Sequence, residues 1–95
     1  MTDTESLYNK AIEARYTTKL SVIKEFLKGQ NYKIVKKGEF IVEVVPPKES
    51  GIGTYKSDLN SEGNPIDEYQ ILFNAVDDII DRLEQTINKL ENNLG

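Results

Sequence analysis

The last third of this 95-residue sequence carries a heptad repeat, which restricts the fold more than any other feature of the chain. Steps of three and four residues alternate from Ile66 onward, and all nine positions that they reach are apolar. These positions, which we call the seam, are Ile66, Tyr69, Phe73, Val76, Ile80, Leu83, Ile87, Leu90 and Leu94. A repeat of this kind keeps one stripe of a helix against a neighbouring helix. The sequence therefore predicts a coiled-coil helix over residues 65–94.

A second amphipathic helix is predicted over residues 3–28. Its apolar stripe consists of Tyr8, Ile12, Tyr16, Leu20, Ile23 and Leu27. Gly29 follows, where a left-handed glycine can close a helix. Branched and aromatic side chains at residues 16–18 lower the local helix propensity, and two shorter helices with a break there are the alternative. Because this helix is shorter than the seam, part of the seam is expected to extend beyond the cover that its own chain provides.

Between the two helices the apolar period changes to two, which predicts a β-hairpin over residues 32–45. A three-residue loop, Lys36–Gly38, would pair Ile34 with Phe40 and place the larger apolar side chains on one face. Two prolines then end the second strand. Residues 46–64 are predicted to be a mobile loop, and a short strand around residues 52–55 is the alternative.

These elements define a single domain of the α+β class over residues 1–95, mostly helical, in the order α-β-β-α. This layout is similar to that of the beta-type subunits of prefoldin, whose helices pair antiparallel and whose hairpins join subunits. Residues 32–42 would be the corresponding hairpin. The loop over residues 48–64 has no counterpart in that layout, and we do not assign the sequence to the family.

Composition narrows the classes of function. The chain has no cysteine and no histidine, which removes thiolate zinc sites, the commonest metal ligand and the easiest general base near neutral pH. No apolar run is long enough to cross a bilayer and no signal peptide is evident, so a soluble cytoplasmic protein is expected. Residues 1–56 carry ten basic and seven acidic side chains, whereas residues 57–95 carry two basic and nine acidic ones. Attraction between the two halves is the simplest interpretation of this division.

The sequence contains only weak matches to metal-binding, catalytic and nucleic-acid-binding motifs. Residues 58–63 resemble the start of a calcium loop, but Tyr69 stands where the final acidic ligand belongs, so no metal is predicted. No nucleophile lies near a suitable base, so no catalytic residue, cofactor or enzymatic activity is predicted. Lysines are common at hairpin tips and on edge strands, where their charge prevents pairing with strands of other molecules. Direct nucleic-acid binding by this hairpin is not expected.

We therefore expect a small non-enzymatic adaptor or assembly protein that self-associates and also binds an unidentified protein. The residues expected at the oligomer or partner interface are Ile80, Leu83, Ile87, Leu90 and Leu94. Further candidate contacts with a macromolecule are Lys33, Lys36, Lys37, Tyr55, Asp77, Asp81 and Glu84. The alternative is a phage or mobile-element inhibitor whose acidic C-terminal helix mimics nucleic acid and blocks a nucleic-acid enzyme.

Overall fold

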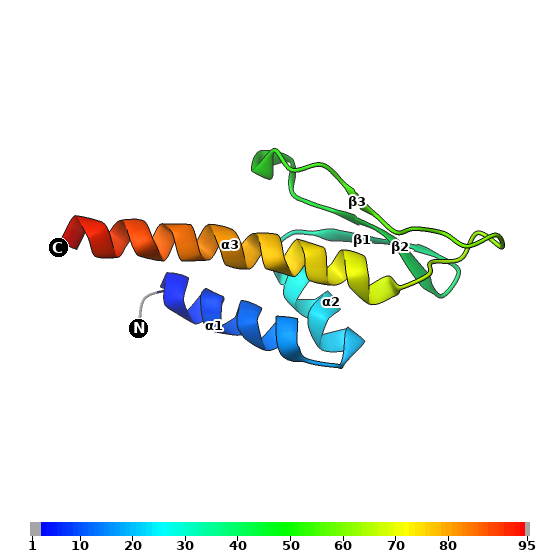
Figure 1. The fold of residues 1–95 in the computed structure, drawn as a ribbon, viewed down its shortest axis with the longest axis horizontal. Helices are drawn as coiled ribbons and strands as arrows, with labels where there is room; N and C mark the ends of the chain where they lie inside the picture. Colours follow the sequence, from blue (N-terminus) through cyan, green and yellow to red (C-terminus); the bar gives the residue numbers. More distant parts are fainter. Residues whose placement is uncertain (1–2, 95) are drawn as a thin grey trace.

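The computed structural model describes the backbone of residues 3–94 and the side chains of residues 3–89. Along the chain the elements are helices α1 (Asp3–Tyr16) and α2 (Leu20–Gly29), strands β1 (Lys33–Lys37) and β2 (Phe40–Val45), the 3₁₀ turn η1 (Lys48–Ser50), strand β3 (Tyr55–Lys56) and helix α3 (Glu68–Leu94). This order confirms the α+β class, with helices before and after a small antiparallel sheet (Figure 1). Within the described residues, no helix combines the length and the apolar character that crossing a membrane requires.

The prediction of one helix over residues 3–28 is wrong, because the chain breaks between α1 and α2. The Thr17 hydroxyl accepts a hydrogen bond from the Lys19 backbone N–H at 3.1 Å, a local bond that competes with the helical ladder. Lys19 itself is extended, with φ −89° and ψ 111°. The break overlaps the segment of low helix propensity, residues 16–18, as in the two-helix alternative. It lets α2 turn toward β1 while α1 stays beside α3 (Figure 1).

The end of α2 is closed by Asn31 and not by Gly29. Asn31 has a φ of 67°, and its N–H donates to the Lys28 carbonyl at 3.0 Å. The next N–H, that of Tyr32, donates to the Leu27 carbonyl at 3.0 Å. This pair of bonds is the Schellman arrangement, which commonly brings together the side chains at its two ends. Tyr32 and Leu27 are accordingly both buried in the core.

The turn of the β-hairpin differs from the prediction. The loop is the pair Gly38 and Glu39, not Lys36–Gly38, and Lys37 pairs with Phe40 across it. Gly38 has a φ of 63°, the positive value that a type II′ turn needs at its first central residue. The predicted register is therefore wrong.

A bulge in β2 changes which side chains face inward. Val42 is the extra residue, because the pairing with β1 passes from Ile41 directly to Glu43. The shift in alternation lets Ile41 and Val44 both point into the core, where they are 1% and 0% exposed. Phe40, expected on the inner face, is 40% exposed.

The segment over residues 46–64, predicted to be a mobile loop, contains regular structure. It begins with η1, and β3 then pairs antiparallel with β2 through Tyr55 opposite Val44. The sheet order is β1-β2-β3, so β1 and β3 form its two edges. The short-strand alternative is thus closer to the structure than the loop.

Helix α3 starts three residues later than predicted. Pro65, the first residue of the predicted helix, forms an isolated β-bridge with Leu59. Asp67 caps the helix, because its Oδ1 accepts a hydrogen bond from the Tyr69 N–H at 2.9 Å.

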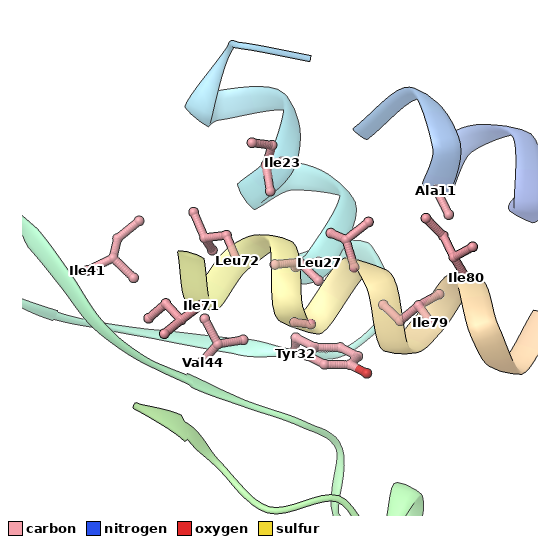
Figure 2. Packing of buried hydrophobic residues seen from close by; sticks show 12 residues of the cluster. Ala11, Ile23, Leu27, Tyr32, Ile41, Val44, Ile71, Leu72, Ile79 and Ile80 are labelled. Carbon is pink, nitrogen blue, oxygen red and sulfur yellow. The ribbon is translucent and has the colours of Figure 1, made fainter. Parts of the chain in front are cut away.

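The core forms around the first half of α3, which contacts the sheet as well as α1 and α2 (Figure 2). Its buried α3 residues are Ile71, Leu72, Ala75, Val76, Ile79 and Ile80. These six residues form adjacent pairs spaced four residues apart, so the buried face of α3 is wide enough to contact both the sheet and the helices α1 and α2. Of these six, only Val76 and Ile80 belong to the seam. The start of the seam is outside the core, with Ile66 69% exposed and Tyr69 36% exposed.

Small residues let α1 approach α3 closely. Ala11 and Ala14 are 0% and 1% exposed, whereas Tyr16, expected in the apolar stripe, is 79% exposed. The apolar stripe predicted from the largest side chains therefore differs from the face of α1 that is buried.

Candidate functional site

Helix α1 runs antiparallel to α3, and three side-chain contacts fix their relative position. The Tyr69 hydroxyl donates to the Thr18 carbonyl at 3.2 Å, at the start of α3. Further along, Arg15 Nε donates to Asp77 Oδ1 at 2.7 Å. Nearest the N-terminal end of α1, the Tyr8 hydroxyl donates to Glu84 Oε1 at 2.9 Å.

The C-terminal end of α3 extends past the start of α1 (Figure 1). The molecule is correspondingly elongated, with extents of 55 × 26 × 18 Å and a radius of gyration of 14.8 Å. A compact domain of this length would have a radius of gyration of about 12 Å. The last turns of α3 account for much of this extension, and α1 does not cover them.

The five predicted interface residues fall into three groups. Ile80 is 8% exposed and lies in the core of its own chain, and Leu83 packs at the margin of that core. Ile87 is half-buried and borders an open recess of about 260 Å³, together with Tyr8, Glu84 and Asn88. The side chains of Leu90 and Leu94 lie outside the described residues. The candidate surface therefore begins at Ile87.

The acidic residues of α3 are largely engaged by other parts of the chain. Asp77 pairs with Arg15, and the Tyr8 hydroxyl donates to Glu84. That hydrogen bond is the main cause that raises the pKa of Tyr8, followed by burial. Asp81 is exposed.

Tyr55 joins the sheet to α3 through Asp78, whose carboxylate accepts a hydrogen bond from the Tyr55 hydroxyl. Burial is the largest cause that raises the pKa of Tyr55, and the Asp78 carboxylate raises it further. The prediction singled out Tyr55 but did not connect it with Asp78.

Arg82 and Tyr32 form a pair that sequence reasoning missed. Arg82 Nη2 donates to the Tyr32 hydroxyl at 2.9 Å, and Arg82 Nε donates to the Asp78 carbonyl at 3.4 Å. Tyr32 is 5% exposed, so its hydroxyl is a fixed point at the margin of the core (Figure 2). No motif could indicate this pair, because its members are 50 residues apart.

The predicted basic contacts Lys33, Lys36 and Lys37 are all exposed on the edge strand β1. Lys37 Nζ donates to the Gly63 carbonyl at 3.4 Å. The positive charge of Lys36 lies close enough to Lys24 on α2 to be the main cause that lowers the Lys24 pKa. Sequence reasoning did not group Lys24 with the hairpin.

The segment that resembles a calcium loop is a turn held by Asn60. Its Oδ1 accepts hydrogen bonds from the N–H groups of Glu62 and Asn64, at 2.9 and 3.1 Å. In the part of the chain that the structure describes, no three acidic side chains gather in a metal-binding arrangement.

Comparison with known proteins gives no relative: no protein family, no curated protein and no solved structure matches this chain.

Proposed function

We propose that this chain is a non-enzymatic intracellular interaction protein that self-associates through the C-terminal end of α3 and presents the resulting assembly to another protein. The observation that carries the proposal is the extension of α3 past the start of α1, with seam positions 87, 90 and 94 on the C-terminal side of Glu84, which accepts the hydrogen bond from Tyr8 of α1. Apolar seam residues on a helix gain stability when a second helix covers them.

The recess beside Ile87 supports a packed interface at this end. Tyr8, Glu84 and Asn88 line this recess together with Ile87, and an apolar side chain from a second copy can seat in it against Ile87. Within the surface that begins at Ile87, isoleucine at position 87 followed by leucine at position 90 fits the pattern that favours two parallel strands. A parallel arrangement also avoids placing Glu84 and Glu91 of the two copies opposite one another, as an antiparallel one would.

The alternative, an inhibitor whose acidic helix mimics nucleic acid, has less support. Such a mimic needs free carboxylates, but Asp77, Asp78 and Glu84 each accept a hydrogen bond from their own chain. Asp81 and Glu84 are the exposed acids of this part of α3. If the alternative holds, affinity for a basic nucleic-acid enzyme will fall steeply with salt, whereas apolar association will tolerate salt.

Sedimentation equilibrium on the wild type and on Ile87→Asp tests the proposal. The wild type is expected to sediment as a multiple of the monomer mass, and Ile87→Asp as a monomer. Ile87 is a better position than Leu83, because Leu83 also packs on the core of its own chain.

The matched control is Ile66→Asp, at a seam position that is 69% exposed and lies just before the start of α3. It makes the same chemical change and should leave the association unchanged. A monomeric wild type would contradict the proposal, as would equal loss of association in both variants.

A further inference from the structure

An open hollow of about 250 Å³ is lined by side chains of α1, of the connection between α2 and β1, of the segment from Pro47 to Ser50 and of the middle of α3. Apolar side chains form its walls: Leu7, Tyr32, Pro47, Ile79 and Leu83. Polar groups at the hollow come from Gln30, Ser50 and Arg82. The hollow is separate from the recess beside Ile87, since the two share no lining residue.

Arg82 brings a positive charge to this apolar hollow. Among the described side chains, the salt bridge is that between Arg15 and Asp77, and Arg82 has no carboxylate within ion-pair distance. Asp78, four residues before Arg82 on α3, accepts the Tyr55 hydroxyl proton on its carboxylate and a hydrogen bond from Arg82 on its backbone carbonyl. A guanidinium has five N–H donors, so three remain after the bonds to Tyr32 and Asp78.

The guanidinium is also held in position. Its bond to the Tyr32 hydroxyl fixes it to a side chain that is 5% exposed and belongs to the core (Figure 2). A cation held in advance loses less conformational freedom when it binds an anion. Ser50, in contrast, donates its hydroxyl proton to the Pro47 carbonyl at 2.6 Å, which leaves Arg82, Gln30 and the Tyr32 hydroxyl as the polar groups for an occupant.

We propose that this hollow binds a small organic acid, with the aliphatic part against Leu7, Ile79 and Leu83 and the carboxylate on Arg82. Apolar walls with one or two convergent polar groups are the usual design of a small-ligand site. The volume corresponds to roughly eight water molecules at about 30 Å³ each, so the occupant is of the size of hexanoate. The site is distinct from the association surface.

A titration of the isotope-labelled protein with hexanoate, followed by amide NMR, tests this site. We expect saturable shifts at Gln30, Ser50 and Leu83 and none at the Gly38 turn. The uncharged isostere hexanamide should bind about tenfold more weakly or worse, which is the factor expected of one charge-assisted hydrogen bond.

Variants separate the roles of charge and shape. Arg82→Gln should weaken hexanoate binding about tenfold or more, whereas Lys89→Gln removes the same charge two helical turns away and should change it less than twofold. Leu7→Trp fills the hollow from α1 and should abolish binding. Ile87→Asp should bind hexanoate like the wild type, so the outcome is independent of self-association.

Equal affinity for hexanoate and hexanamide would overturn the proposal, and so would full retention of binding in Arg82→Gln. Shifts that do not saturate, or that spread over the whole protein, would show nonspecific binding only and would also overturn it.

Discussion

Arg15 and Asp77 are 62 residues apart in the sequence, and their side chains meet at 2.7 Å to join the first helix to the last. The same guanidinium lies over the Phe73 ring, with its carbon 4.5 Å from the ring centroid. It lies 5.9 Å from the Tyr16 centroid. One side chain thus combines an ion pair with stacking on aromatic rings, at the surface where α1 meets α3.

Arg15→Gln should lower the free energy of unfolding by about 1 kcal/mol, measured by urea denaturation. The ion pair alone contributes little, because its side chains are 34% and 47% exposed and solvent screens them. The contact with Phe73 supplies the rest. Arg15→Lys should give an intermediate loss, because lysine keeps the charge but not the planar group. Zero coupling between Arg15→Gln and Asp77→Asn in a double-mutant cycle would contradict the role of the pair.

Ala11→Leu should destabilise the protein by about 1–3 kcal/mol, because Ala11 is fully buried where α1 meets α3 and has no room for a larger side chain. Tyr16→Ser is the contrasting change and should stay within about 0.5 kcal/mol of the wild type, since Tyr16 is 79% exposed. Thermal unfolding of both variants checks the assignment of the buried face of α1. A larger loss of stability in Tyr16→Ser than in Ala11→Leu would instead support the apolar stripe predicted from the sequence.

Two glycine substitutions should act in opposite directions. Gly38→Ala should cost about 1 kcal/mol, because a φ of 63° strains any residue with a β-carbon. Gly29→Ala should stabilise by about 0.4–1 kcal/mol, since Gly29 is helical and an added β-carbon there meets nothing within 4 Å. Chemical denaturation of the pair is the measurement. Equal effects would contradict the left-handed turn at Gly38.

Alkaline pH should destabilise the fold through Tyr55. Burial and the Asp78 carboxylate raise the pKa of the folded Tyr55 above its unfolded value near 10. The folded chain therefore holds the phenolic proton after the unfolded chain has lost it, so this contribution is complete below pH 10 and declines as the pH rises above that. Tyr55→Phe should show a shallower loss of stability above pH 10, measured by urea denaturation at several pH values.

The control for that measurement is Tyr16→Phe, which changes an exposed side chain in the same way. It should keep the wild-type dependence on pH. If Tyr55→Phe and Tyr16→Phe give the same curve, the hydrogen bond to Asp78 does not contribute in this range.

Sequence periodicity was sufficient for the class of fold and for the order of N-terminal helical segment, hairpin and C-terminal helix, because these segments have clear apolar repeats. It failed at positions where local bonds change the register. The Thr17 hydroxyl divides the first helix, and the bulge at Val42 changes which strand residues face inward. Neither feature alters the apolar pattern over a window of ten residues, so periodicity alone does not detect them.

The candidate sites were predictable only in part. The seam identified α3 as the main packing element, but α3 lies between two sets of neighbours and its buried face departs from a simple heptad. Arg82 did not stand out in the sequence, because its importance comes from Tyr32 and from walls contributed by three separate segments. Sites assembled by long-range packing leave no local signal.

The antiparallel course of α1 along α3 also determines where the protein can be labelled. Because α1 begins near the end at which α3 finishes, a tag fused to either terminus would lie at the same end of the molecule as the proposed association surface (Figure 1). The turn at Gly38 lies at the opposite end of the molecule (Figure 1). A fluorophore or a linker to a surface, attached at the neighbouring Glu39, would leave the C-terminal end of α3 free to bind another copy of the chain.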